Sequence, residues 1–429
     1  MFVLAVLAVG GILGALVAEL RLRRGEAAMG QEWRRLLDAE SFEAAFPTHS
    51  TNETALEVEA SARALGIDFF QPAGLDLSPD AVAETRWRRA SPAIHEFLGQ
   101  LLKAPSRNAW PELEPAASSY LRWAQPRLLQ LARDLEEGPP LQFHRDLADP
   151  SQPVAGGIGL YQLQKVLAAA AALALQEDRP QTAERLLEAA WELATAIRRE
   201  PQVVHQLISL AMLQRQLAVL RGHCSPSPRW LHRLQVTELR PPLRVALEAQ
   251  TYYFASLARW DGPVESLIDT QFSLDPNSDL PGYESFHQPL LRPLIRWSLR
   301  DTAVRYHRHL QRLDRIEPRD FDAGAACRDL AQSIPRWQLV GQIVTSCLAE
   351  VWTRALSREL HLELTEKVLQ ERLHPVDQDY RLESNAVPGL FWLRESQPDE
   401  VVIRLENGLP HPPANEPDLL YRLTPSDCP

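Results

Sequence analysis

The segment that most restricts how this chain can fold lies at its N-terminus. Residues 2–18, FVLAVLAVGGILGALVA, are 17 consecutive apolar residues without a charged side chain. A helix rises about 1.5 Å per residue, so this segment would span about 26 Å, close to the thickness of a bilayer's hydrocarbon core. Arg21, Arg23 and Arg24 follow it and can extend toward lipid headgroups. The sequence therefore predicts a single-pass transmembrane anchor over residues 1–24.

Two other interpretations of residues 2–18 have less support. A cleaved signal peptide carries its basic residues before the apolar core, whereas here they come after it. A buried core helix needs partners on every side, and a segment at the end of a chain has few. The anchor predicts a location in the inner (cytoplasmic) membrane. The positive-inside rule then puts the body in the cytoplasm, unless a basic leader is missing from the start of the sequence.

Composition excludes some classes of partner and site. The chain has 429 residues and a formal net charge of −11, whereas nucleic-acid-binding domains are usually basic, so no nucleic-acid partner is expected. Its four cysteines form no CxxC pair, which excludes a zinc ribbon or a thioredoxin-type motif by spacing. We expect plain thiols at Cys224, Cys327, Cys347 and Cys428, and no metal or cofactor.

Residues 25–374 predict a mainly α-helical body of antiparallel helical hairpins, in a bundle or a short solenoid. The periodicity is clearest over residues 158–221, where three apolar stripes at helical spacing are separated by short turns. Other helices are expected at about 79–103 (with a break or kink at Pro92), 115–137, 226–236, 241–259, 290–316, 325–333 and 336–373, with a loop over 260–289. Residues 375–429 contain short β-like runs between Pro, Gly and Asn, which predict a small antiparallel sheet.

Residues 164–199 resemble one tetratricopeptide-type helical hairpin. Ala171, Ala183 and Ala190 occupy positions where that repeat needs small residues, although the proline near its end is missing. The whole layout resembles a group of uncharacterised membrane-anchored bacterial proteins, through the N-terminal apolar helix, the hairpin, the helix around 206–213 and the β-rich tail. That tail is in turn similar to the end of type II secretion pseudopilins. The resemblance implies a membrane-anchored protein and no catalytic residues.

Familiar catalytic signatures are missing from the sequence. His95-Glu96 lacks the second histidine of a zinc-protease motif. His307 and His309 are two residues apart, so on a helix they point about 160–200° away from each other, and we expect both at the surface. An enzyme would have to assemble its site from distant residues, for which the candidates are His205, Glu248, Asp261, His287 and Arg336.

The densest run of arginines lies between residues 292 and 319. On a helical wheel, an apolar stripe that includes Leu299, Tyr306 and Leu310 faces away from most of these arginines. This pattern is typical of a solvated helix face. The alternative is contact with an anion or a partner, through Arg305, Arg308, Arg312 and Arg315.

The leading expectation is therefore a membrane-anchored, non-catalytic helical scaffold that binds a protein partner. An enzyme with a dispersed site is the second hypothesis, and a component of a secretion or pilus-like envelope machine is the third. The third requires the tail sheet to pack along the anchor helix.

Overall fold

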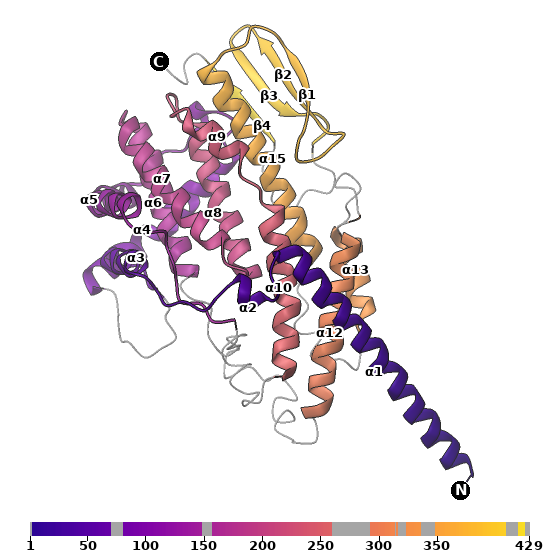
Figure 1. The fold of residues 1–429 in the computed structure, drawn as a ribbon. Coiled ribbons are helices and arrows are strands. Elements are labelled where there is room, and N and C mark those ends of the chain that lie inside the picture. Colours follow the sequence, from indigo (N-terminus) through magenta and orange to yellow (C-terminus); the bar gives the residue numbers. More distant parts are fainter. Residues whose placement is uncertain are drawn as a thin grey trace.

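A computed structural model of the chain describes most of its residues, and it is mainly helical with a four-stranded antiparallel sheet at the C-terminal end, as the sequence predicts (Figure 1). The predicted loop over 260–289, including Asp261 and His287, lies outside the described residues, as does Arg336. The described residues are 2–69, 80–147, 157–259, 292–313, 315, 323–335, 348–408 and 419–424.

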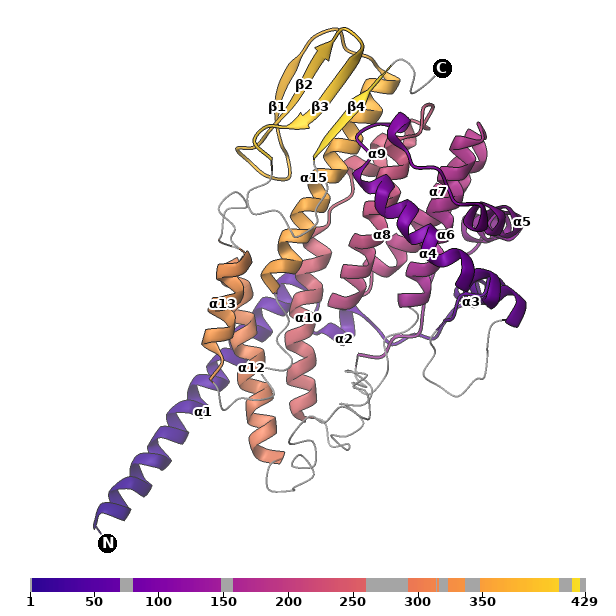
Figure 2. The same cartoon turned by 180° about the vertical axis from the view of Figure 1, so that it is seen from behind.

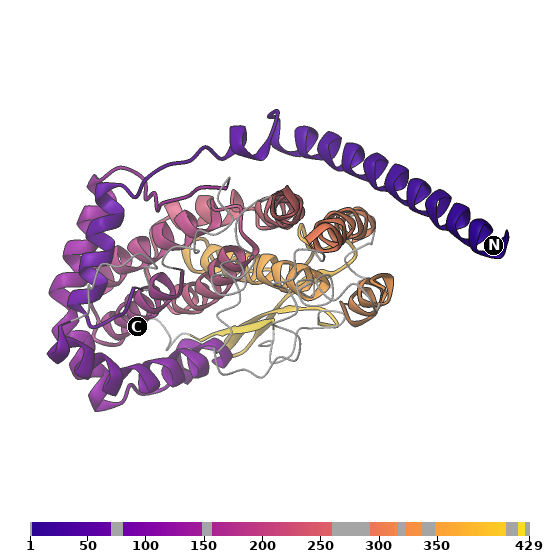
Figure 3. The same ribbon diagram turned by 90° about the horizontal axis from the view of Figure 1, so that it is seen from below.

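The first helix, α1 (Phe2–Leu37), is 36 residues long and continues without interruption past residue 24, where the anchor was expected to end. Its N-terminal part projects away from the body, and its C-terminal part lies against it (Figures 1 and 3). Leu13, Leu16 and Val17 are exposed, whereas Leu22 and Met29 are buried. The transition from exposed to buried apolar side chains therefore falls near residue 20.

The chain after α1 forms a short helix, α2, that packs against α1, and then continues into α3, α4 and α5 on the side of the body away from the N-terminus (Figure 1). Asp80 caps α4 by accepting hydrogen bonds from the backbone N–H groups of Val82 and Ala83 (2.8 and 3.0 Å). The predicted break at Pro92 is wrong, because the helix continues through it. The elements are α2 (Phe42–Ala45), α3 (Glu53–Ala64), α4 (Ala81–Lys103), the 3-10 helix η1 (Arg107–Ala109) and α5 (Pro115–Glu137).

The main core is centred on α6 (Gly157–Gln176), α7 (Pro180–Arg198) and α8 (Val203–Arg221), which pack on one another through short connections, as predicted. Among the described helices, α6 and α8 are long and apolar enough to cross a membrane, but 83% and 67% of their most apolar windows are buried inside the protein. Buried polar groups on them find backbone partners, since Gln164 donates to the carbonyl of Met212 (2.9 Å) and Gln216 to that of Leu187 (2.6 Å). Both helices therefore belong to the core of the body.

The remaining helices pack beside this core, with α10 and α12 next to α1. Helix α10 packs against α12 along its length, α1 lies across both, and α15 runs beside α8 and α10 (Figures 1 and 2). These helices are α9 (Arg229–Gln235), α10 (Arg240–Arg259), α12 (Arg292–Leu313), α13 (Ala323–Ser333) and α15 (Leu348–Leu373).

The C-terminal sheet is a meander in the order β1-β2-β3-β4, and it covers one face of α15 (Figure 1). Trp392 and Tyr421 from the sheet are buried against Leu360 and Val368 of α15. The backbone N–H of Arg422 also donates to the carbonyl of Pro105 (2.7 Å), which ties the last strand to the body. The strands are β1 (Tyr380–Glu383), β2 (Phe391–Gln397), β3 (Glu400–Leu405) and β4 (Leu420–Leu423).

Candidate functional site

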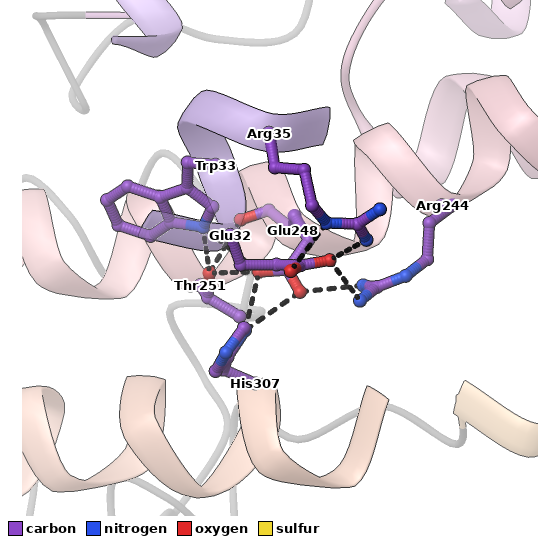
Figure 4. A network of polar contacts seen from close by, with 7 residues as sticks. All are labelled: Glu32, Trp33, Arg35, Arg244, Glu248, Thr251 and His307. Carbon is purple, nitrogen blue, oxygen red and sulfur yellow. Dashed lines mark hydrogen bonds and ion pairs between the residues drawn. The ribbon is translucent and has the colours of Figure 1, made fainter. Parts of the chain in front are cut away.

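A group of buried charged side chains lies where α1 meets the body. Glu248 comes from α10, His307 from α12, and Trp33 from α1 (Figure 4). Glu248 is 0% exposed and His307 is 2% exposed. We call this group, with Glu32, Arg35, Arg244 and Thr251, the Glu248 network.

The carboxylate of Glu248 is the centre of the network, and each of its oxygens has several donors. Oε1 lies 2.6 Å from Nη1 of Arg244 and 2.8 Å from Nδ1 of His307. Oε2 accepts from the indole Nε1 of Trp33 at 3.0 Å and lies 3.1 Å from the hydroxyl of Thr251. A buried carboxylate needs such donors to offset its lost hydration, so the contacts explain why Glu248 can lie in the core.

The network continues from Glu248 to the surface through a second acid. Arg244 lies 3.7 Å from Glu32 of α1, and Glu32 is also bound by the guanidinium of Arg35 (2.5 Å from Nη2 to Oε1). Side-chain exposure rises along this chain from 8% at Arg244 to 15% at Glu32 and 72% at Arg35. Within the described residues, the ion pairs of Arg244 with Glu32 and of Glu32 with Arg35 thus connect Glu248 to an exposed side chain of α1.

Both acids are held in their ionised form. Burial alone would raise the pKa of Glu248, but the hydrogen bond from His307 and the charge of Arg244 outweigh it and lower that pKa. The hydrogen bonds from Arg35 lower the pKa of Glu32 as well, against the effect of burial. The Nδ1 of His307 must carry a proton to donate to Glu248, and within the described residues its buried Nε2 has no hydrogen-bond partner.

A second contact between α1 and α12 lies nearer the apolar segment. Arg300 of α12 binds Glu26 (2.7 Å) and Glu19 (3.3 Å), which are seven residues apart on α1. Gly25 lies between them, and a Cβ atom there would come within 2.4 Å of Cγ1 of Val304. The absence of a side chain at Gly25 lets the two helices approach closely.

An aromatic cluster extends the attachment of α1 toward α2. Trp33 packs edge-to-face on Phe42 and on Tyr252, with ring centroids 5.6 Å apart in each case. Such pairs contribute roughly 0.5–1.5 kcal/mol beyond the apolar area they bury. Trp33 therefore combines a large apolar contact with a hydrogen bond to the central carboxylate.

The buried position of Glu248 and His307 restricts the access of other molecules to them. A carboxylate beside a histidine is a common acid–base pair, but a substrate must reach one of the two groups. Glu248 and His307 are enclosed by three helices. The described residues also contain no group of three or more His, Cys, Asp or Glu side chains that could hold a metal ion.

The sequence candidates are distributed over several places. His205, near the start of α8, is buried beside Gly157 and does not join Glu248. The prediction that His307 and His309 lie at the surface is wrong, since they are 2% and 6% exposed. Helix α12 is packed on more than one side, so side chains on opposite faces of it can both be buried.

The four arginines proposed for anion or partner contact lie on α12 or just after it and differ in exposure. Arg305 is half-buried and binds Asp301 (2.7 Å) and the carbonyl of Ser333 (2.7 Å). The other three, Arg308, Arg312 and Arg315, are exposed. The predicted apolar stripe opposite them is confirmed, since Leu299, Tyr306 and Leu310 are buried.

Cys224 differs from its expected state. It takes part in a disulfide, so the prediction of a plain thiol is wrong for this residue. The side chains of Cys327, Cys347 and Cys428 lie outside the described part of the structure. The spacing of cysteines along the sequence could not reveal disulfide pairing, because a disulfide depends on the distance between two cysteines in the folded structure.

Several residues of the network had no functional signal in the sequence. Trp33 and Glu32 follow the predicted anchor, in a stretch without a predicted element. A weak signal existed at Arg244 and Glu248, whose spacing of four residues puts opposite charges side by side within an apolar helix.

Comparison with protein-family models, with curated proteins and with solved structures finds no match for this chain.

Proposed function

We propose that this protein is a membrane-anchored, non-catalytic helical scaffold, held in the membrane by residues 2–18 and presenting its body to a protein partner. The observation that carries the proposal is the continuity of α1. The same helix contains the charge-free segment at its N-terminal end and the Glu248 network at its C-terminal end. A helix joined so firmly to the body transmits the position of the anchor to the rest of the molecule.

Membrane fractionation tests the anchor. We expect the full chain to sediment with membranes, to resist extraction by alkaline carbonate and to be released by detergent, because a spanning helix is held by lipid rather than by surface charge. A variant lacking residues 2–18 should be soluble. A variant with Arg21, Arg23 and Arg24 changed to Gln serves as control and should stay in the membrane. Carbonate extraction of the full chain, or sedimentation of the deletion variant, would contradict the proposal.

The side on which the body lies is a separate part of the proposal. The arginines after residue 18 favour the cytoplasm. The disulfide at Cys224 favours an oxidising compartment, since cytosolic proteins rarely keep such bonds. We give the disulfide more weight, because it is a feature of the folded body itself, and infer that the body lies outside the cytoplasm.

Protease treatment of spheroplasts tests that orientation. Added protease should degrade the body while a cytoplasmic marker stays intact, and protection of the body until the cells are lysed would overturn it. Affinity purification from solubilised membranes then tests the scaffold role, for which we expect one stoichiometric protein partner. Recovery of the protein alone would argue against a scaffold.

The two alternatives have less support. An enzyme would need Glu248 or His205 in an accessible cleft with other candidates, and both are buried apart from each other. A pilin-like role would need the tail sheet along the anchor helix. The sheet packs on α15, while α1 packs on α2, α10 and α12. We therefore propose neither.

A further inference from the structure

A cavity of about 710 Å³ opens on the body at the turn between α7 and α8. The other walls come from the chain before α3, the segment after α5 and the start of α10, so four separate parts of the sequence meet there. No member of the Glu248 network lines it. Its volume is within the usual range for small-molecule sites, roughly 300–1,000 Å³.

Basic side chains form one part of the lining. His49 and Arg145 are fixed next to each other, because each donates its backbone N–H to the carbonyl of the other (3.1 Å in both directions). The guanidinium of Arg145 binds Glu200 (3.1 Å) and lies over the ring of Phe46, 5.3 Å from its centroid. Among the described residues, its buried Nε has no hydrogen-bond partner, and neither has Nδ1 of His49.

Two further arginines bring positive charge to the cavity. Arg198 is the last residue of α7 and Arg199 caps it, and within the described residues neither has a carboxylate at ion-pair distance. Burial, and then the charge of Arg199, lower the pKa of Arg198 to about 10 against the opposing effect of the Glu192 charge, so Arg198 remains charged at neutral pH. The acid in the lining, Glu200, already binds Arg145, and burial raises its pKa. The lining thus carries an excess of positive charge.

The free carbonyl groups at the C-terminus of α7 do not by themselves explain why Arg198 and Arg199 lie there. Cations near a helix C-terminus interact favourably with its free carbonyl groups. Here the amide of Gln206 donates to the carbonyls of Arg198 (2.7 Å) and Glu200 (2.9 Å). Among the described residues, the Arg198 side chain makes one long hydrogen bond, to the hydroxyl of Thr195 (3.5 Å). Its donors are therefore available to a ligand.

Apolar side chains form the rest of the lining. Phe46, Leu141 and Val245 contribute to it, together with prolines from three of the wall segments. A ligand that carried only charge would leave these apolar side chains exposed to water, whereas a ligand with an apolar part would bury them.

We propose that the cavity binds a small organic anion with an apolar body. Arg198 and Arg199 hold the anionic group, and Phe46, Leu141 and Val245 contact the apolar part. A guanidinium matches a carboxylate through paired N–H donors, which is why arginine suits this role. The proposal is independent of membrane attachment.

Calorimetric titration of the full chain in a non-ionic detergent tests the proposal. The probes are 3-phenylpropanoate, its neutral analogue 3-phenylpropanol, and acetate. We expect 3-phenylpropanoate to bind at least about tenfold more tightly than either of the others, since it alone satisfies both parts of the cavity. The double variant R198Q/R199Q should lose at least about tenfold in affinity for 3-phenylpropanoate and keep its weak affinity for the alcohol.

Two further variants separate a binding effect from a folding effect. The single variant R199Q changes an exposed side chain, so it should fold normally and weaken 3-phenylpropanoate binding by about threefold or more. R127Q changes an exposed arginine on α5 and should leave binding unchanged. Equal affinity for acid and alcohol, undiminished affinity in R199Q, absence of 3-phenylpropanoate binding, or equally tight binding of inorganic phosphate would each overturn the proposal.

Discussion

Glu248 accepts hydrogen bonds from side chains of three helices, α1, α10 and α12. Removing its carboxylate would deprive the buried Arg244 of an acid 2.6 Å away and His307 of its acceptor. Buried ion pairs contribute little over an apolar core, but removing one partner alone is strongly destabilising. The intact ion pairs of Glu248 therefore add little to the stability of the protein, whereas the unpaired groups produced by its removal would reduce that stability strongly.

We predict that Glu248→Ala lowers the free energy of unfolding by about 3–5 kcal/mol, because charged and polar donors remain buried without an acceptor. Urea unfolding of the full chain in detergent, followed by tryptophan fluorescence, measures this. Glu57→Ala, at an exposed position on α3, is the matched control and should change stability by less than about 0.5 kcal/mol. Similar stabilities for the two variants would contradict the prediction.

The same residue gives a prediction on pH. The pKa of Glu248 is lower in the folded protein than its ordinary value of 4.5. At pH values between the folded and unfolded pKa, the unfolded chain therefore binds more protons than the folded protein does. Its contribution is complete above the unfolded pKa and is lost as pH falls through the folded pKa. The difference in unfolding free energy between wild type and Glu248→Gln should therefore be largest near neutral pH. It should shrink as pH falls below 4.5, and a difference that grows there would refute this linkage.

At the scale of elements, the contact between α1 and α12 depends on a missing side chain. Gly25→Ala should destabilise the protein by about 1–3 kcal/mol, because its Cβ would overlap with Val304 in a packed interface. Gly30→Ala, on the same helix with nothing within 4 Å of its Cβ, should be neutral or stabilising, by up to about 1 kcal/mol, through helix propensity alone.

Chemical denaturation of the two glycine variants tests this contact, and the double variant G25A/V304A shows whether the overlap is the cause. Shortening Val304 makes room for the new Cβ, so the double variant should recover part of the lost stability. Equal effects of G25A and G30A would mean that the helices do not pack as closely as described.

The sequence predicts the elements well where periodicity dominates. The stripes over 158–221 and the strands of the tail depend on spacing, and α6, α7, α8 and β1–β4 match them. Pro92 was misjudged because its cost is local, while the apolar face of α4 on both sides of it is held by packing against α5 and α6. The burial of His307 could not be predicted, since a wheel drawn for one packed face takes no account of helices on other sides.

The candidate site was predictable only in fragments. Glu248 was among the enzyme candidates, and Arg244 lies one helical turn before it. Their partners Trp33 and His307 are more than 50 residues away along the chain from Glu248, at 215 and 59 positions. The meeting of α1, α10 and α12 is a property of tertiary packing, which one sequence does not encode as a local pattern.

At the scale of the whole molecule, the tail sheet is attached to the helical body through α15. Arg394 of β2 binds Glu371 of α15 (2.7 Å), and the two side chains are 4% and 8% exposed. Arg404 of β3 binds Glu395 (2.6 Å) in the sheet itself, where both side chains are 38–40% exposed. The Arg394–Glu371 pair therefore joins the sheet to the helical body, whereas the Arg404–Glu395 pair lies within the sheet.

Arg394→Met should therefore loosen the tail, at a cost of about 3–5 kcal/mol, because Glu371 would be left buried without its partner. Arg404→Met should cost less than about 1 kcal/mol. Limited proteolysis followed by mass spectrometry can measure the rate of release of the fragment after residue 374. Equal release from the two variants would mean that the Arg394–Glu371 pair does not hold the tail.

The uninterrupted course of α1 has a consequence for how this molecule would move. A flexible tether lets a domain tumble above a bilayer, but a helix of 36 residues is a rod of about 54 Å, of which about 26 Å would lie within lipid. The body would then be carried at a fixed height and tilt, and its diffusion would be confined to a plane. Partners anchored in the same membrane would meet one defined face of the body. The fixed orientation would therefore restrict which of these partners can reach the body at all.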